Sequence, residues 1–153
     1  MDQTANYRKP GLLTRKIMNP FVVVMMRLGV SIWGSRILEV PGRTSGLPRR
    51  TPVNLLELDG RRYLVSPRGD GQWVKNVRSN GGRLDLLLGH RRQGYAAQEL
   101  SDDEKSPVLR AYLRKWKMEV GMFFDGVTAE SDEVEVQRIA PSHPIFVLTE
   151  AVN

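Results

Sequence analysis

Between residues 36 and 100, short hydrophobic runs alternate with turn residues, which is the pattern of β-strands. The pattern predicts strands over 36–40, 51–58, 61–66, 83–88 and 93–99. Asp59 and Gly60 separate the second run from the third, and this dipeptide accepts the positive φ angles of a type I′ turn. The segment 51–66 is therefore predicted to form a β-hairpin.

Two later segments have the periodicity of helices. In the segment 72–80, one helical face is formed by Trp73, Asn76, Val77 and Asn80. The glycines at 81 and 82 end that helix. Ser101 and Glu104 fit a capping box, and the amphipathic pattern after them predicts a helix over 107–117.

The last hydrophobic runs, 134–139 and 145–148, are predicted to be closing strands. Strands in hairpin succession favour an antiparallel sheet, and closing that sheet into a barrel removes its exposed edges. A doubly wound nucleotide-binding fold is disfavoured, because only one helix lies between the central strands. The predicted fold class is mainly β (α+β), an antiparallel barrel of about six to seven strands with about three helices over 36–153.

Residues 1–35 are predicted to be a helical extension of this domain. Asn19 and Pro20 suit a helix start, Gly29 suits its end, and the run 21–28 between them is nearly all apolar. Such a helix must be buried on the barrel or at a dimer contact, or it rests on a membrane surface or lines a substrate entrance. It is too short to span a bilayer, which takes about 20 apolar residues.

Composition narrows the chemistry that the chain can carry. The 153 residues, 41% of them hydrophobic, suffice for one compact core. The absence of cysteine excludes disulfide scaffolds and cysteine nucleophiles and fits a cytoplasmic location. His90 and His143 have no ligand-spaced partner, so neither a metal site nor a serine–histidine triad is predicted.

The charge of the chain predicts an anionic partner. The formal net charge is +6 and the isoelectric point is near 10.0. Nucleic acid, an anionic membrane surface and a polyanionic small molecule all fit that charge. Nucleic acid is disfavoured, because the strands lack the stripe of aromatic residues on which single-stranded bases stack.

Two loops carry the candidate chemistry. The loop 41–50 holds two glycines, two hydroxyl residues and three arginines, a combination that grips phosphate or carboxylate oxygens. The loop 66–71 leads into the helix 72–80, whose N-terminus favours the same oxygens. Two such loops on neighbouring strands suggest one elongated anionic ligand, with Trp73 and Asn76 beside a ring system. The alternatives are a solvated basic turn, a core tryptophan and a surface asparagine.

Taken together, these segments resemble the deazaflavin-dependent nitroreductase family of actinobacterial oxidoreductases. The resemblance covers residues 36 to about 149 and rests on the string 42–49, the hairpin after it, the loop 66–69, the helix segment 73–76 and the helix segment 107–113. It implies a split β-barrel of the FMN-binding type and use of coenzyme F-420. It also implies transfer of a hydride from the reduced cofactor to an apolar oxidised acceptor such as a quinone, a nitro compound or an activated alkene.

The resemblance also assigns roles to residues. The cofactor's phosphate and glutamate tail would be held by Arg43, Thr44, Ser45 and Arg49. The phosphate and deazaflavin ring would be flanked by Ser66, Arg68, Gly69, Trp73 and Asn76. No side chain is predicted to be a catalytic acid or base, and the final proton would come from solvent.

The chain departs from the drug-reducing members of that family in the segment 116–124, where they carry pocket tyrosines and this chain has none. The expected substrate pocket is formed by Trp116, Met122, Phe123 and Phe124. It would admit a flat or lipophilic acceptor, although the same side chains also suit a core. The missing phenols favour, as an alternative, a non-catalytic carrier of deazaflavin or of a lipid-like ligand. The shared barrel keeps FMN as an alternative cofactor, and a homodimer and peripheral contact with the inner membrane face through the N-terminal helix also fit.

Overall fold

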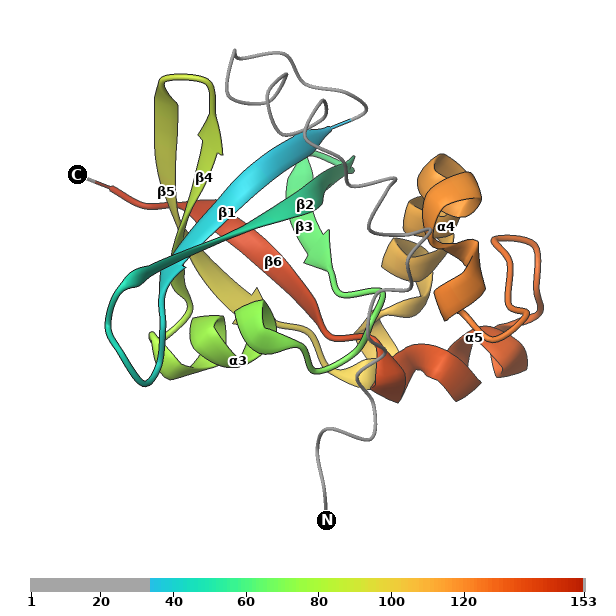
Figure 1. Cartoon of the computed structure of the whole chain (residues 1–153). Helices are drawn as coiled ribbons and strands as arrows, with labels where there is room; N and C mark the ends of the chain where they lie inside the picture. Colours follow the sequence, from blue (N-terminus) through green and yellow to red (C-terminus); the bar gives the residue numbers. More distant parts are fainter. Residues whose placement is uncertain (1–33, 153) are drawn as a thin grey trace. The chain divides into compact units, whose positions relative to one another are not determined.

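The computed structural model describes residues 34–152, and its strands form a closed antiparallel barrel (Figure 1). The strands are β1 (Ser35–Pro41), β2 (Pro48–Leu58), β3 (Arg61–Val65), β4 (Arg83–Leu88), β5 (Arg91–Glu99) and β6 (Ile145–Glu150). Neighbours around the barrel follow the order β1-β2-β3-β6-β5-β4. This architecture confirms the predicted fold class, with six strands in the described part of the chain.

Three α-helices accompany the described strands. They are α3 (Gln72–Ser79), α4 (Ser106–Val120) and α5 (Glu133–Ile139). Short 3-10 turns lie at η2 (Asp102–Glu104), η3 (Gly121–Phe123) and η4 (Ala140–Ser142). The helices predicted over 72–80 and 107–117 are confirmed as α3 and α4, and the capping box between Ser101 and Glu104 is present.

The predicted hairpin is also confirmed. Asp59 and Gly60 join β2 to β3 with φ angles of 52° and 76°, both positive as a type I′ turn requires. Glycine adopts such angles without strain, and aspartate is one of the side chains that tolerate them. The turn therefore forms for the local reason that the sequence predicts.

The strand predicted over 134–139 is wrong, because this segment is helix α5. Asp132 caps the helix by accepting a 2.9 Å hydrogen bond from the backbone N–H of Glu135. Val136 and Ile139, three residues apart, form the buried face, whereas Val134 is 79% exposed. The spacing of Val134 and Val136 resembled strand alternation, and the N-cap was the missed indication of a helix.

The predicted N-terminal extension lies outside the described residues, except for its last two. The apolar helix expected over 21–28 and its membrane-surface interpretation are therefore not described by the structure. Within residues 34–152, no helix is long and apolar enough to cross a membrane.

The described chain forms two compact units. The helical unit consists of Leu56–Gly71 and Gln98–Val147. The strand unit consists of the described residues 34–55, Gln72–Ala97 and the described residues 148–152. The basic loop 41–50 and α3 belong to the strand unit, and the loop 66–71 belongs to the helical unit.

The core of the helical unit contains a group of aromatic side chains. The ring of Tyr112 lies 4.9 Å from that of Trp116 and 6.1 Å from that of Phe124, centroid to centroid. Such pairs contribute about 0.5–1.5 kcal/mol each beyond the burial of their area. Backbone angles at Trp116 (φ −121°, ψ 22°) interrupt α4, so its fully buried side chain marks a kink in that helix.

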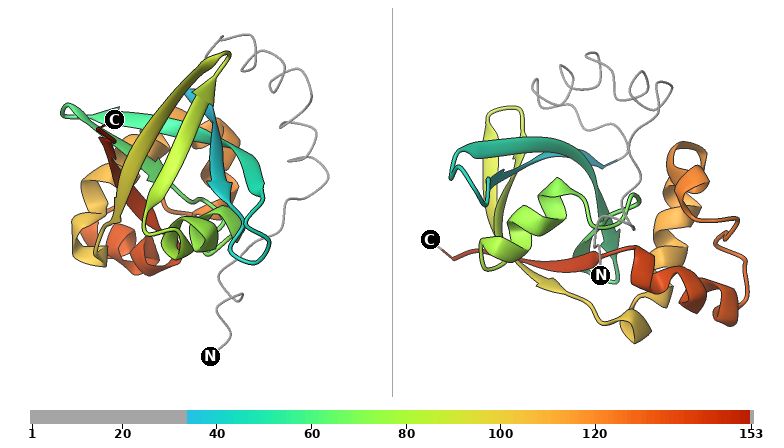
Figure 2. Two further views of the ribbon diagram at one scale, coloured as in Figure 1. Left: turned by 90° about the vertical axis from the view of Figure 1, so that its left-hand side faces the viewer. Right: turned by 60° about the horizontal axis from the view of Figure 1, so that its bottom comes forward.

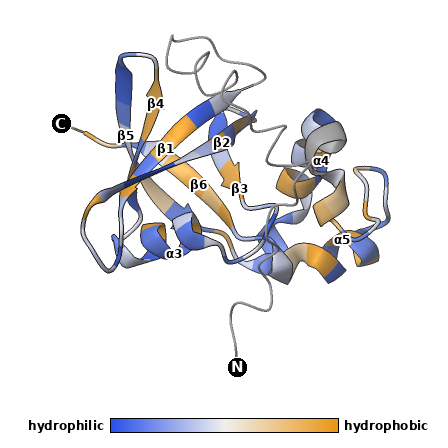
Figure 3. Ribbon diagram, in the orientation of Figure 1, coloured by the Kyte–Doolittle hydropathy of each residue, from blue (hydrophilic) through white to orange (hydrophobic). Residues whose placement is uncertain are grey.

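The strand unit fixes α3 at its buried face and at its C-terminal end. Val74 and Val77 are fully buried, and the N–H of Gly82 donates a 2.9 Å hydrogen bond to the carbonyl of Val77. The carbonyl of Gly82 in turn accepts a 2.7 Å hydrogen bond from the N–H of Ala97 on β5. Figure 3 shows hydrophobic colour along β4, which begins directly after this connection. These contacts place Trp73 and Asn76 of α3 on a rigid support.

Candidate cofactor site

Backbone hydrogen bonds shape the loop between β1 and β2. The N–H of Gly42 donates to the carbonyl of Leu47, and the N–H of Gly46 donates to the carbonyl of Gly42, both at 2.8 Å. The hydroxyl of Ser45 accepts a 3.1 Å bond from the N–H of Leu47. With these ends closed, the exposed side chains of Arg43 and Ser45 project from a fixed turn.

Asn76 anchors this loop to α3. Its Oδ1 accepts a 3.1 Å bond from the backbone N–H of Arg43 and a 2.9 Å bond from Nη1 of the same arginine. Asn76 is buried, and two donors aimed at one atom require its carbonyl oxygen there. Asn76 was predicted to be a polar handle for the ring, and the structure gives it a second role, which is to position Arg43.

The loop and α3 border a hollow of about 700 Å³ within the strand unit, which we call the basic hollow. Its lining residues are Val40, Gly42, Arg43, Thr44, Ser45, Pro48, Arg49, Arg50, Thr51, Gln72, Trp73 and Asn76. Figure 2 shows the β1–β2 loop and α3 side by side, in agreement with this lining. The lining carries three arginines and no carboxylate, so the hollow favours an anion.

The arginines of the basic hollow are not equivalent. Nε of Arg50 lies 2.7 Å from Oε2 of Glu39, and the other carboxylate oxygen of Glu39, Oε1, binds Arg92. Hydrogen bonds from Arg92 and then Arg50 hold the pKa of Glu39 below its usual range against the opposing effect of desolvation. Arg43 and Arg49 have no carboxylate partner within residues 34–152, so their charges remain available to a ligand.

Gly42 leaves room for the side chains that define this surface. A Cβ at this position would lie 3.0 Å from the hydroxyl oxygen of Ser45 and 3.3 Å from Nε of Arg49. Both contacts are tighter than side chains normally make. Glycine therefore allows Ser45 and Arg49 to pack over the backbone of the loop.

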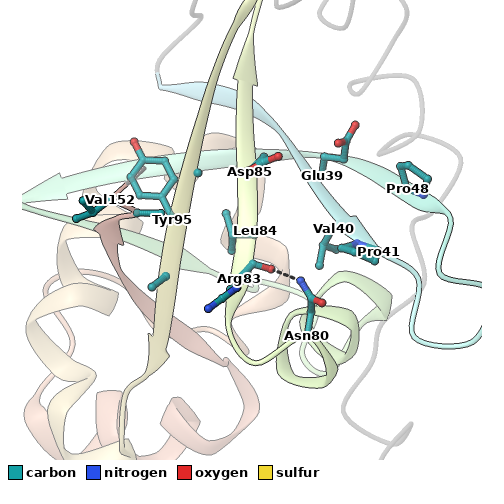
Figure 4. A pocket seen from close by; sticks show the side chains of 13 residues that line it. Glu39, Val40, Pro41, Pro48, Asn80, Arg83, Leu84, Asp85, Tyr95 and Val152 are labelled. Carbon is teal, nitrogen blue, oxygen red and sulfur yellow. Dashed lines mark hydrogen bonds between the residues drawn. The ribbon is translucent and has the colours of Figure 1, made fainter.

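A second hollow in the strand unit, of about 560 Å³, has a different character (Figure 4). It shares Val40 and Pro48 with the basic hollow, but its lining includes the carboxylates of Glu39 and Asp85. Two carboxylates beside Arg83 make this hollow unsuitable for a polyanion. The basic hollow is therefore the better site for an elongated anionic ligand.

The second predicted loop, 66–71, is fixed from within the helical unit. Ser66 is buried, and its hydroxyl donates a 2.6 Å bond to the carbonyl of Gly69. The backbone N–H of Ser66 donates a 2.9 Å hydrogen bond to the carbonyl of Pro144. The carbonyl oxygen of Ser66 lies 3.2 Å from Nδ1 of His143. Gly69 has a φ of 87°, which favours glycine. Ser66 thus shapes this loop, whatever contact it makes with a ligand.

The predicted substrate residues separate into buried and exposed members. Trp116, Phe123 and Phe124 are buried in the core of the helical unit, as the alternative core role given in the sequence analysis requires. Met122, in contrast, is 56% exposed. The guanidinium carbon of Arg68 lies 5.2 Å from the centroid of the Phe123 ring, within range of a cation–π interaction. Phe123 therefore supports a residue of the second loop.

Comparisons with known proteins identify the family. Residues 13–121 match the model of a family described as F-420H(2)-dependent quinone reductase, which is more than half of the chain. The chain belongs to this family. Its cofactor is coenzyme F-420, and its reaction is transfer of a hydride from reduced F-420 to quinone-like acceptors. The predictions of an oxidoreductase and of its cofactor are confirmed, and no functionally curated protein is significantly similar in sequence.

Solved structures of distant relatives have the same fold. One described as an F-420-H2-dependent reductase (FDR-A) is 16% identical with a TM-score of 0.52, covering 76% of this chain and 94% of its own. Another, described as a domain-swapped dimer, is 17% identical with a TM-score of 0.54, covering 83% and 91%. A putative 5-nitroimidazole antibiotic resistance protein from Bacteroides thetaiotaomicron is 10% identical with a TM-score of 0.51, covering 86% and 79%.

The residues of the basic hollow fit the cofactor of the quinone reductase family. F-420 carries a phosphate and glutamate carboxylates, and the hollow offers two arginines without carboxylate partners among the described residues. Hydroxyl groups of Thr44 and Ser45 can donate to the same oxygens, and the half-buried indole of Trp73 offers a flat surface to a ring. The absence of carboxylates from the lining removes the main source of repulsion.

The basic hollow brings together six of the nine predicted cofactor residues. They are Arg43, Thr44, Ser45, Arg49, Trp73 and Asn76. The other three, Ser66, Arg68 and Gly69, lie in the loop of the helical unit. Gln72 and Thr51 also line the hollow but were not among the predicted residues, although Gln72 precedes Trp73 and Thr51 follows the predicted loop 41–50. The sequence analysis also gave no role to His143, for which the sequence offers no local indication.

Proposed function

We propose that this quinone reductase holds the phosphate and glutamate tail of F-420 in the basic hollow, through Arg43 and Arg49. The observation that carries the proposal is the pair of arginines in a lining without carboxylates. Charge-assisted hydrogen bonds to phosphate and carboxylate oxygens are the strong ones in proteins, and guanidinium groups can make them in pairs. The hydroxyls of Thr44 and Ser45 add neutral donors, and Trp73 flanks the ring.

We extend this proposal to the loop 66–71 on chemical grounds. Arg68 offers a third guanidinium, and Gly69 allows close approach of the backbone to a phosphate. The contact of Arg68 with Phe123 supports this role, because it holds the guanidinium in one place before a ligand arrives. Ser66 contributes by shaping the loop.

The acceptor is proposed to be an apolar oxidised molecule, such as a quinone, a nitro compound or an activated alkene. Bound F-420 supplies the hydride in its reduced form. The protein's task is to orient the ring, exclude water and place the acceptor, for which the exposed Met122 is a candidate contact. The segment 116–124 has no tyrosine, so the proposal takes the final proton from solvent.

Steady-state oxidation of reduced F-420 tests whether the chain is an enzyme or a carrier. Turnover is expected with menadione, because the acceptor need only be flat and apolar, and a nitroimidazole tests the extension to nitro compounds. The rise in absorbance as oxidised F-420 forms is followed with and without protein at equal acceptor concentration. Tight binding of F-420 without turnover of either acceptor would identify a carrier instead.

Replacing Arg49 by glutamine is expected to raise the Kd for F-420 about 10-fold, because one charge-assisted contact with the tail is lost. The riboflavin-level deazaflavin, which lacks the phosphate and glutamates, should bind the variant and the wild type equally. Fluorescence titration measures both ligands, with FMN in parallel to establish the cofactor preference. Arg91→Gln removes an exposed arginine outside both hollows and is the charge-matched control. An equal loss of both deazaflavins would place Arg49 at the ring instead.

The relative described as a domain-swapped dimer motivates a further element of the proposal, a homodimer. The predicted N-terminal helix at 21–28 remains a candidate for either a dimer contact or a membrane surface. We also propose a cytoplasmic location, where reduced F-420 and the enzyme would meet. These elements are independent of the assignment of the basic hollow.

A further inference from the structure

His143 is one of the buried polar residues of the helical unit, and the proposed function assigns it no task. It lies between η4 and β6, and its ring stacks on Phe124 with centroids 4.2 Å apart and an interplanar angle of 18°. Phe124 is itself fully buried beside Tyr112. The imidazole therefore has a defined plane and little freedom to rotate.

The ring nitrogen Nδ1 of His143 lies 3.2 Å from the carbonyl oxygen of Ser66. A carbonyl oxygen can only accept, so Nδ1 carries the proton and donates it. The neighbouring residue Pro144 accepts a 2.9 Å bond from the N–H of Ser66. His143 and Pro144 thus hold both backbone polar groups of Ser66, at the point where β3 ends and the loop 66–71 begins.

The hydroxyl of Ser66 continues this arrangement into the loop. It donates a 2.6 Å hydrogen bond to the carbonyl of Gly69. The same carbonyl accepts a 2.8 Å bond from the N–H of Gly71. With all its polar groups bonded, Ser66 transmits the position of His143 to the backbone around Gly69. The loop is therefore ordered by contacts within the helical unit.

The residue before Phe124 supports the same loop at a second point. Phe123 lies under the guanidinium of Arg68, 5.2 Å from ring centroid to guanidinium carbon. Adjacent aromatic residues thus support the loop in two ways, Phe123 through Arg68 and Phe124 through His143. This gives the segment predicted to line the substrate pocket a structural task.

We propose that His143 is a positioning residue for cofactor binding, which through Ser66 holds the loop 66–71 in the form that receives the F-420 phosphate. The proposal rests on the proposed function of that loop. Its physical basis is preorganisation, because a loop already in its bound conformation loses less conformational freedom when the ligand binds. His143 itself does not touch the cofactor in this proposal.

The test compares two substitutions of His143. His143→Phe keeps a ring on Phe124 but removes the Nδ1 donor, and His143→Asn restores a side-chain donor near the same place. The Phe variant is expected to raise the Kd and KM for F-420 about 5- to 10-fold, while the KM for menadione and kcat at saturating F-420 stay near wild type. The Asn variant should bind F-420 within about twofold of wild type.

A structural role alone would give a different result. It would lower the Tm of the Phe variant and leave the F-420 Kd of the folded protein unchanged, and that outcome overturns the proposal. Failure of the Asn variant to recover affinity would also overturn it. Should His143→Phe not fold, His143→Met lacks the ring donor, fills the site flexibly and makes the same comparison.

Arg68→Gln separates this inference from the function on which it rests. If Arg68→Gln binds F-420 as tightly as wild type, the loop does not hold the phosphate, and that part of the proposed function fails. If Arg68→Gln weakens binding and His143→Phe does not, the loop holds the cofactor without help from His143. In that second case the positioning role of His143 is wrong, while the proposed function of the loop stands.

Discussion

Replacing Gly82 by alanine is expected to lower the free energy of unfolding by about 3–5 kcal/mol, among the largest effects of a single substitution. A Cβ at this position would lie 2.3 Å from the carbonyl oxygen of Ala97. That oxygen belongs to backbone and cannot move alone, because the N–H of Ala97 donates to the carbonyl of Gly82 at 2.7 Å. The φ of 82° adds strain for any side chain.

Gly81→Ala is the matched control for this prediction. Its φ of 66° is also positive, but a Cβ there would meet no atom within 4 Å. It should therefore cost only the strain of the left-handed conformation, about 1–2 kcal/mol. Urea unfolding followed by tryptophan fluorescence measures both variants. Equal losses would show that backbone conformation, and not the contact with β5, makes Gly82 necessary.

The predicted effect also bears on the cofactor site, because Gly82 joins α3 to the sheet. Its N–H bonds to Val77 at the end of α3, and its carbonyl bonds to β5. A shift of this connection would move α3 and with it Trp73 and Asn76 of the basic hollow. The Gly82 variant is thus expected to lose F-420 affinity as well as stability.

The features that the sequence predicted well are those with a local cause. The hairpin β2–β3 follows from Asp59 and Gly60, whose positive φ angles belong to the turn itself. The capping box at Ser101 and the helix-ending glycines 81 and 82 act within a few residues. The loop 41–50 could be proposed as a binding loop because its glycines, hydroxyls and arginines are adjacent in the chain, and its role stays a prediction.

The two features that the sequence analysis missed have different causes. Helix α5 was taken for a strand because Val134 and Val136 alternate, although the N-cap at Asp132 was a local indication of a helix. The bond between His143 and Ser66 joins residues 77 positions apart. Nothing in the composition around His143 indicates such a partner.

Asn76 illustrates a residue whose place was predicted and whose role was not. The sequence analysis placed it in the candidate site because it lies on α3 close to Trp73, and in the structure it lines the basic hollow. Its bonds to Arg43, 33 positions away in the chain, could not be derived from helical periodicity. A contact of Asn76 with the ring and its observed contact with Arg43 predict different F-420 affinities when Asn76 and Arg43 are both replaced.

Replacing Arg43 by glutamine is expected to weaken F-420 binding by about 2 kcal/mol, or about 30-fold in Kd. The loss combines a guanidinium contact with the tail and part of the positive charge of the basic hollow. Asn76→Leu keeps the branched shape and the number of side-chain heavy atoms but removes the acceptor for both Arg43 bonds. It is expected to raise the Kd for F-420 about 10-fold, because the loop loses its anchor on α3.

The double variant Arg43→Gln, Asn76→Leu decides how Asn76 acts. If Asn76 works through Arg43, the two substitutions share one interaction, and the double variant should bind F-420 only slightly less well than Arg43→Gln alone. If Asn76 contacts the ring independently, the two losses should add, to about 300-fold in Kd. Fluorescence titration of the folded variants, with thermal melts to confirm folding, measures this coupling. A large coupling would establish that the affinity of the basic hollow depends on the orientation of Arg43 as well as on its charge.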